Sequence, residues 1–404
     1  MDSLTSYPTS RVGAPPLSQT STNLIKAGLS ALHYSGLGRL LAPRTRGQGA
    51  VLMLHHVTPE PPAGFAPNAL LQITPHFLDE VVREVRRQGY DTINLDEASD
   101  RISGRVNASR PFVCFTFDDG YRDNRDHALP VLERHGVPFT VYLTTDFADG
   151  QGFLWWLVLE RVIAVRRYLS VDLAGKSETF RCNSDAEKTA AFERIYWHLR
   201  TMPEVQARAL VADLAHEAGL DPLAPCRELA MTWQEIREFA THPLVTFGGH
   251  TISHMALAKL SSADALAEIA GSVARIEAEI GRPCRHFSYP YGSVDAAGER
   301  EFEIAARLGL ATAVTTRKGV IGAHAASRPT ALPRLSLNGN FQNVRYFKAL
   351  MSGVPFAALD LARRPRRAAA PDYLPAGSPE ASSGFCIQRT SHAAGTTQAR
   401  PPTT

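Results

Sequence analysis

The chain has 404 residues, five cysteines and a formal net charge of +3, from 43 basic and 40 acidic side chains. This length allows one core of barrel size, with residues left for an insertion or a tail. Because the basic residues are spread along the chain, the charge does not indicate a nucleic-acid partner. An odd number of cysteines without a CxxC pair is typical of a reducing compartment rather than of a disulfide framework.

The two ends of the chain differ in composition from its middle. Residues 1–48 form an N-terminal segment whose first 22 residues are rich in Ser, Thr and Pro, so we expect them to be disordered. Residues 24–41 carry apolar side chains at mixed helical spacing, which predicts a short amphipathic helix that docks on the protein or, alternatively, lies on a membrane surface. Residues 365–404 are rich in Arg, Ala, Pro and Ser and predict a disordered tail.

The sequence shows no membrane span and no secretion signal. No segment is apolar over enough residues to cross a bilayer, and the first residues lack a basic stretch followed by an apolar one. We therefore expect a cytoplasmic protein, with peripheral membrane association left open. The sequence does not predict an oligomeric state.

Strand and helix patterns alternate through most of the remaining chain, residues 49–340. Apolar, β-prone runs predict strands at 50–54, 90–93, 111–117, 137–143, 244–248, 286–289 and 310–316. Thr74-Pro75 predicts the start of a helix that ends at Gly89, and further helices are expected at 125–135, 262–280 and 298–308. Strand, helix, strand at this spacing indicates parallel pairing and an α/β fold.

The alternation stops between about residues 153 and 230, where the signals are helical. Ser184-Asp185-Ala186-Glu187 is a capping box, which predicts the start of one helix in this stretch. We therefore expect a helical insertion on the rim of the fold. Trp155 and Trp156 at its start would stack on a sugar ring if they are exposed, or pack between helices if they are buried.

Two adjacent aspartates, Asp118 and Asp119, follow the predicted strand at 111–117, and Gly120 can turn the chain after them. Ionised aspartates are seldom buried without a partner, so this pair indicates a cation or a catalytic task. The alternative is a surface turn, because Asp-Gly is common in turns.

His250 and His254 follow the strand at 244–248 and can converge on one cation with a carboxylate from elsewhere in the fold. Two histidines and one carboxylate leave room for a water in a catalytic zinc site, and the cation lowers the pKa of that water. The second aspartate is then free as a general base. Zinc, cobalt and nickel all suit this ligand set.

Three segments resemble the first three motifs of the polysaccharide deacetylases, the NodB homology group or carbohydrate esterase family 4. They are Thr116-Phe117-Asp118-Asp119-Gly120, His250-Thr251-Ile252-Ser253-His254 and Ser288-Tyr289-Pro290-Tyr291-Gly292. The resemblance spans about residues 51–337. It implies a distorted (β/α)7 TIM-like barrel and metal-dependent removal of acetyl groups from N-acetylglucosamine-containing glycans such as chitooligosaccharides.

The resemblance also implies a role for each matching residue. Asp118 would be the catalytic base. The metal ligands would be Asp119, His250 and His254. The backbone N–H of Tyr291 would help to hold the oxyanion, with Pro290 beside it as a further candidate for substrate binding. Trp155 is a candidate for substrate binding because of its own ring and not because of the resemblance.

The chain departs from the family pattern in two places. Ser288 stands where the family has an arginine that buttresses the base, and the late leucine-histidine motif has no match, since that region reads Leu332-Pro333-Arg334-Leu335. Instead, the first strand ends in Leu52-Met53-Leu54-His55-His56-Val57, which resembles deacetylases of the poly-N-acetylglucosamine type. We therefore expect His55 to be the general acid, and His56 to point the other way if the strand continues. His324 is the one late alternative.

These observations predict hydrolysis of the N-acetyl groups of a glycan, with release of acetate. Two alternatives stay open: a deacylase or amidase acting on a non-glycan substrate, and a catalytically silent glycan-binding barrel, which Ser288 favours. A cytoplasmic location fits an enzyme that acts on a lipo-oligosaccharide precursor, as in nodulation-factor synthesis.

Overall fold

The structure, a computed structural model, describes residues 19–363. The predicted disordered tail at 365–404 lies outside the described residues. So do residues 1–18 of the N-terminal stretch predicted to be disordered, whereas residues 19–22 form the first turn of a helix.

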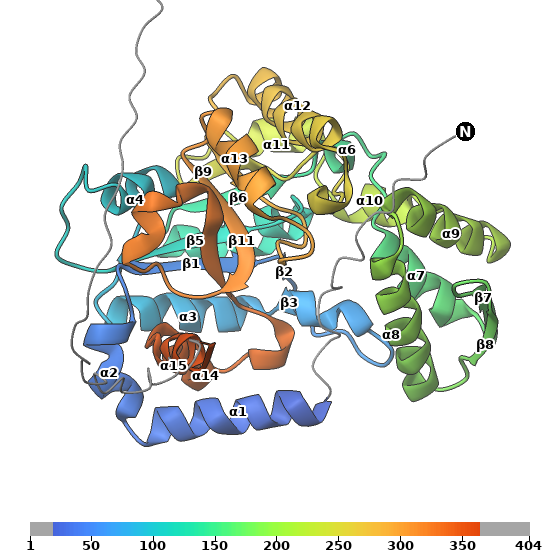
Figure 1. Cartoon of the computed structure of the whole chain (residues 1–404), viewed down its shortest axis with the longest axis horizontal. Coiled ribbons are helices and arrows are strands. Elements are labelled where there is room, and N and C mark those ends of the chain that lie inside the picture. Colours follow the sequence, from blue (N-terminus) through green and yellow to red (C-terminus); the bar gives the residue numbers. More distant parts are fainter. Residues whose placement is uncertain (1–18, 364–404) are drawn as a thin grey trace, which may run out of the picture. The chain divides into compact units, whose positions relative to one another are not determined.

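Seven parallel strands close into a distorted barrel, which confirms the predicted fold class (Figure 1). Adjacent strands of the barrel pair in parallel throughout, and the last strand in the ring hydrogen-bonds to the first. In spatial order the strands are β1 (Gly49–Leu54), β12 (Leu332–Ser336), β11 (Thr312–Lys318), β10 (His286–Ser288), β9 (Val245–Gly249), β6 (Phe139–Leu143) and β5 (Phe112–Phe117).

Two differences from the predicted strands concern the edges of this ring. The strand predicted at 90–93 is only β4 (Asp91–Thr92), which pairs with the start of β5 outside the closed ring. The strand that closes the barrel, β12, was not predicted at all. Pro333 and Arg334 interrupt its apolar pattern, and neither residue is expected inside a buried strand.

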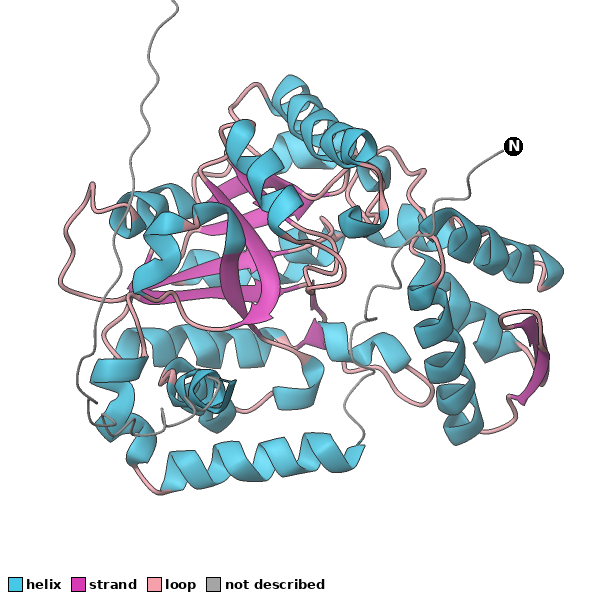
Figure 2. Ribbon diagram, viewed as in Figure 1, coloured by secondary structure: helices cyan, strands magenta, loops and turns pink. Residues whose placement is uncertain are grey.

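Helices surround the barrel (Figure 2). They are α3 (Pro75–Arg87), α4 (Leu95–Ile102), α5 (Leu129–Arg134), α11 (Trp233–Phe239), α12 (Ser262–Ile280), α13 (Glu299–Arg307), α14 (Val344–Met351) and α15 (Val354–Arg363). The predicted helix at 125–135 begins with a π-helical turn, η2 (Asn124–Ala128), ahead of Pro130. The side chain of Thr74 caps α3 by accepting a hydrogen bond from the Phe77 N–H at 3.2 Å, as its sequence position predicted.

The strands are buried on both faces, so their residues pack alternately on two sides. Along β1, Ala50, Leu52 and Leu54 belong to the largest hydrophobic cluster, which includes the apolar face of α3. Val51 belongs to a different cluster, with Phe112 and other strand residues. Because all seven strands are parallel, the residues that follow them meet at one rim, where barrel enzymes carry their active sites.

The N-terminal segment forms two helices rather than the single one predicted, α1 (Gln19–Tyr34) and α2 (Leu37–Thr45). Gly36 separates them with a φ of +74°. Leu29 of α1 is buried against Tyr346 and Ala349 of α14, so α1 docks on the protein. Among residues 19–363, no helix is both long and apolar enough to cross a membrane.

The segment between β6 and β9 contains several helices with a hydrophobic cluster of their own. These are α6 (Thr145–Ala148), α7 (Trp155–Val165), α8 (Asp185–Thr201), α9 (Glu204–Glu217) and α10 (Ala224–Leu229). The capping box of α8 is present as predicted. A short parallel pair, β2 (His56–Val57) with β3 (Gln72–Ile73), lies just beyond β1.

The same segment also contains an antiparallel hairpin that the helical prediction did not include, β7 (Tyr168–Asp172) and β8 (Ser177–Arg181). Its tight turn places Ala174 and Gly175 at φ values of +60° and +78°. Leu173 and Lys176 exchange backbone hydrogen bonds across it. Two consecutive positive φ angles are the mark of a type I′ turn, for which Asn-Gly is the usual sequence signal.

Ala174→Asn should therefore stabilise the protein, because asparagine tolerates a positive φ better than alanine. An alanine in the left-handed backbone conformation lowers the free energy of unfolding by about 1–2 kcal/mol, of which we expect asparagine to restore about 0.5–1 kcal/mol. Chemical denaturation followed by circular dichroism measures the free energy of unfolding. Ala174→Val is the matched control and should lower that free energy, since a β-branched side chain fits a positive φ poorly. Equal stability of the two variants would contradict the turn geometry.

Candidate active site

Asp118 and Asp119 follow β5 at the rim of the barrel and are both buried, with exposed fractions of 2% and 3%. The Asp118 N–H donates to the Leu54 carbonyl at 2.9 Å, which joins the ends of β5 and β1. Asp119 has a φ of +73°, so the chain turns sharply and the two carboxylates meet different partners. A surface turn, the alternative interpretation of this sequence, is excluded by this burial.

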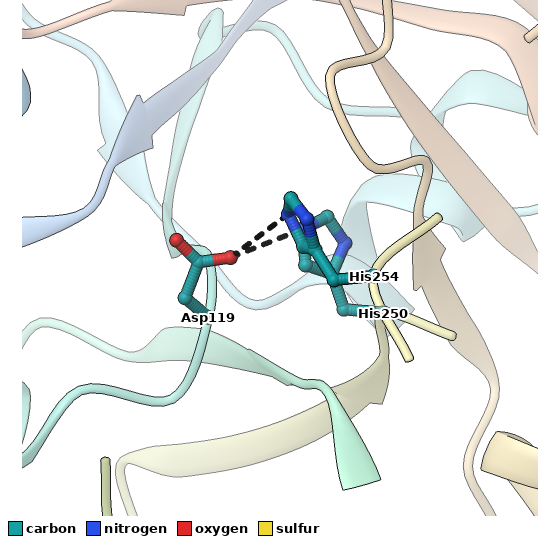
Figure 3. Close-up of side chains that lie close together, drawn as sticks. All are labelled: Asp119, His250 and His254. Carbon is teal, nitrogen blue, oxygen red and sulfur yellow. Dashed lines mark ion pairs between the residues drawn. The ribbon is translucent and has the colours of Figure 1, made fainter. Parts of the chain in front are cut away.

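Asp119, His250 and His254 form a compact group of possible metal ligands (Figure 3). Asp119 Oδ1 lies 3.4 Å from His250 Nε2 and 3.3 Å from His254 Nε2. This oxygen is buried and has no hydrogen-bond partner among the described residues. A buried, unsatisfied carboxylate oxygen facing two imidazole nitrogens fits a divalent transition metal.

The two imidazoles are held in different ways. His250 Nδ1–H donates to the Ser288 carbonyl at 2.6 Å, which directs Nε2 toward Asp119 in the manner usual for metal-binding histidines. The His254 ring lies against the rings of Phe147 and Trp156, at centroid distances of 5.7 and 5.0 Å. These contacts fix both rings without using the nitrogens that face Asp119.

Asp118 is paired with Arg334, a residue that the sequence analysis did not select. The guanidinium contacts both carboxylate oxygens, Nη1 to Oδ1 at 2.8 Å and Nη2 to Oδ2 at 2.7 Å. Arg334 is 1% exposed, and its remaining N–H groups donate to the Thr315 carbonyl and to the hydroxyls of Thr116 and Ser288. The arginine that seemed absent because of Ser288 is therefore supplied from β12, and Ser288 accepts a hydrogen bond from it.

This pairing decides the ionisation of the base candidate. Burial raises the pKa of Asp118, but the Arg334 guanidinium, together with the nearby His250 and His55, outweighs burial, so the pKa lies below its usual value. Asp118 is thus an ionised carboxylate in a buried position, as a general base must be near neutral pH.

His55 lies next to Asp118, with Nε2 3.9 Å from Asp118 Oδ2 and a side chain that is 18% exposed. Burial lowers the pKa of His55, whereas the nearby Asp118 carboxylate raises it, and the net shift is downward. β1 ends at Leu54, so the strand that was expected to turn His56 away does not continue through His55; His56 pairs with Asp123, its Nδ1 lying 2.5 Å from Asp123 Oδ2. His324 is exposed on η4 (Ala323–Ser327), and no ion pair joins it to the residues at the rim among residues 19–363.

Tyr291 is the third strand-end candidate and lies just beyond β10. Its φ is +59°, and its backbone N–H donates to no other described residue. The Tyr291 ring is 4.9 Å from that of His254, between centroids, and so adjoins the metal-ligand group. Pro290 is buried and its carbonyl accepts the Gly292 N–H at 2.7 Å, which makes the turn tight.

Trp155 is 4% exposed and stacks on Tyr196 inside the insertion. Its indole N–H donates to the Tyr291 hydroxyl at 2.9 Å. A stacking platform for a sugar needs an exposed ring face, which the buried Trp155 does not offer. Its contact with the Tyr291 hydroxyl instead positions Tyr291.

Comparison with known proteins identifies the family of the chain. Residues 105–313, just over half of the chain, match the family model of the polysaccharide deacetylases. The chain belongs to this family. The part that matches the polysaccharide deacetylases contains Asp118, Asp119, both histidine ligand candidates and Tyr291, whereas His55 and Arg334 lie outside it.

Individual relatives are distant. The putative polysaccharide deacetylase YxkH of Bacillus subtilis (strain 168) is 40% identical over 55 residues, which cover 14% of this chain and 20% of the relative. The match therefore spans about a fifth of the relative's length. Deacetylase PplD of Streptococcus pyogenes, solved with acetate, is 16% identical with a TM-score of 0.49, covering 75% of this chain and 97% of that one. IcaB from Ammonifex degensii is 20% identical with a TM-score of 0.47, covering 75% and 98%.

Arg334→Met should destabilise the protein by about 3–5 kcal/mol, because it leaves the Asp118 carboxylate buried without its partner. In the double variant Arg334→Met/Asp118→Asn no charge is left unpaired, so part of this loss should be recovered. Denaturant midpoints measure both effects. Arg328→Met, which removes an exposed arginine paired with exposed Glu299, is the control and should change stability by less than about 0.5 kcal/mol. No recovery in the double variant would contradict the pairing as the source of the effect.

Proposed function

We propose that this protein is a metal-dependent deacetylase that hydrolyses N-acetyl groups of N-acetylglucosamine-containing oligosaccharides or polysaccharides and releases acetate. Membership of the polysaccharide deacetylase family supports the glycan substrate. The observation that carries the proposal is the convergence, on one barrel rim, of an ionised Asp118, the adjacent His55 and a buried metal-ligand group.

The metal would be held by Asp119, His250 and His254. Zinc suits this mixed nitrogen and oxygen donor set best, and cobalt or nickel would also fit. When bound, such a cation supplies a Lewis acid that lowers the pKa of water and polarises a carbonyl group.

The remaining steps belong to the protein's own side chains. Asp118 acts as the general base, and Arg334 keeps it ionised until it accepts a proton. The Tyr291 N–H donates a hydrogen bond to the oxygen on which negative charge develops. His55 then protonates the leaving amine, and its position 3.9 Å from Asp118 puts the group that accepts a proton beside the group that donates one.

Metal analysis combined with acetate release from a panel of chitooligosaccharides tests this function. The proposal predicts about one bound divalent metal per chain and acetate release that a chelator abolishes. Metal without acetate release from any glycan, but with cleavage of simple amides, would favour the non-glycan deacylase. Glycan binding without any hydrolysis would favour the silent barrel. That alternative was suggested by Ser288, and the Arg334 contact removes the reason for it.

Single substitutions should separate the metal ligands from the base. Asp119→Ala, His250→Ala and His254→Ala should each lose the metal on dialysis and lose acetate release with it. Asp118→Asn keeps the shape of the side chain, so it should keep the metal and lose about 10²–10⁴-fold in kcat. Metal content by mass spectrometry and kcat from acetate release are the measurements. Full metal retention in the three alanine variants would show the ligand assignment to be wrong.

His55→Ala should lower kcat for an acetamide substrate by about 10²–10⁴-fold without changing metal content. An aryl acetate ester has a leaving group that needs little protonation, so the same variant should hydrolyse it much better than the acetamide. His324→Ala is the control and should resemble the parent on both substrates. If His324→Ala were the impaired variant and His55→Ala were normal, the general acid would lie late in the chain.

A further inference from the structure

The insertion between β6 and β9 reaches the candidate metal site through an arginine. Arg208 lies on α9, and its Nη2 donates hydrogen bonds to the backbone carbonyls of Ser253 and His254, both at 2.9 Å. The Arg208 side chain is 13% exposed, so these bonds are largely shielded from water. A charged donor in such a place forms stronger hydrogen bonds than a neutral one.

The loop that Arg208 contacts is strained. Thr251 and His254 have φ values of +67° and +59°, which non-glycine residues seldom adopt. Each such residue costs of order 1–3 kcal/mol and persists only where the surroundings hold it in place. Because His254 is itself a metal-ligand candidate, relaxation of its backbone would move Nε2 away from Asp119.

Other groups hold this loop as well. Glu268 of α12 accepts hydrogen bonds from the N–H groups of Ile252 and Ser253 at 2.9 and 3.0 Å. The Thr251 hydroxyl accepts the His254 N–H at 2.8 Å. These two contacts act on N–H groups of the loop. The N–H groups of Thr145 and Asp146 in α6 donate to the carbonyls of Thr251 and Ile252 at 3.2 and 2.9 Å, whereas Arg208 contacts the carbonyl of His254, the residue that carries the ligand.

Arg208 is itself held in place by a buried charge network. Glu204 is 6% exposed, and its carboxylate oxygens lie 3.7 Å from Arg208 Nε, 3.6 Å from Arg200 Nη1 and 3.5 Å from Lys259 Nζ. Lys259 also donates to the carbonyls of Arg200 and Met202, which ties the ends of α8 and α9 to the barrel. This network keeps the Arg208 guanidinium directed at the loop that carries His254.

A second arginine of the insertion contacts the other site loop. The Arg200 guanidinium carbon lies 3.7 Å from the centre of the Tyr291 ring, and Trp155 donates to the hydroxyl of the same tyrosine. The insertion therefore contacts both loops that flank the metal-ligand group, one through Arg208 and one through Arg200.

We propose that Arg208 is a positioning residue for the metal ligand His254, so that the insertion, and not only the barrel, sets the affinity of the metal site. This inference rests on the metal role in the proposed function, but it does not depend on the identity of the substrate. It predicts that substitution of Arg208 weakens metal binding although Arg208 donates no ligand atom.

The experiment compares the Zn²⁺ dissociation constant of the full chain, by competition with a chromogenic chelator, in three variants and the parent. Arg208→Met removes both hydrogen bonds and should weaken binding about 10–100-fold, as loss of a partner that orients a ligand does. Arg208→Lys keeps the charge beside Glu204, so the fold should be retained. Its Zn²⁺ dissociation constant should lie between those of Arg208→Met and the parent. Arg161→Met is the control, because Arg161 lies on α7 of the same insertion and pairs with Glu228 away from the site; it should bind Zn²⁺ like the parent.

Visible absorption of the Co²⁺-loaded protein provides a second measurement, because its bands report ligand geometry rather than stability. The inference predicts an altered spectrum for Arg208→Met and an unchanged one for Arg161→Met. Parent-like affinity and spectrum in both Arg208 variants would overturn it, as would equal weakening in Arg161→Met.

These outcomes are distinguishable from failure of the proposed function. If the parent binds Zn²⁺ but releases no acetate from any glycan, the glycan proposal fails, whereas weaker binding in Arg208→Met would still support the inference. A parent that binds no Zn²⁺ would overturn the metal role and this inference together.

Discussion

The ion pair between Arg334 and Asp118 is the interaction on which the rest of the site depends. Two adjacent carboxylates cannot both stay ionised inside a protein unless cations compensate them, since isolated buried charges are very costly. Arg334 compensates Asp118 through two hydrogen bonds, and this leaves Asp119 free to face the histidines. The two aspartates can therefore have different roles because one has a permanent partner within the chain and the other does not.

Closure of the barrel delivers this arginine. β12 lies between β1 and β11 in the sheet, with Leu335 opposite Leu52. Arg334 lies on β12 and His55 directly follows β1, so these two neighbours of the Asp118 carboxylate come from adjacent strands although they are far apart in the sequence. Both lie outside the segment that matches the family, so the chain completes its site with the two strands that also complete its barrel.

The sequence predicted the barrel class and the strand-end motifs because buried parallel strands and adjacent chemical groups leave local patterns. It did not predict β12, because an arginine and a proline break the apolar pattern, and the charge of Arg334 makes sense only beside Asp118. The hairpin was missed because Ala174 occupies a position where asparagine would have signalled the turn. Trp155 was a candidate for stacking on a sugar because the local sequence does not show that its ring is buried. Its packing on Tyr196 and its hydrogen bond to Tyr291 are tertiary contacts.

The charges at the rim also fit the reaction that we propose. Asp118, Asp119 and Arg334 together carry a net charge of −1, and the positive charges of Arg200, Arg208 and Lys259 lie around Glu204 and are not part of this count. A divalent cation held by Asp119 and two neutral imidazoles would change the local charge from −1 to +1. A site of charge +1 stabilises the single negative charge that develops when an acetamide carbonyl is attacked, and such preorganised charge is often the largest contribution to catalysis. Without Arg334 the same metal would bring the site only to zero, so the pair that keeps the base ionised also leaves the site with the sign that the transition state requires.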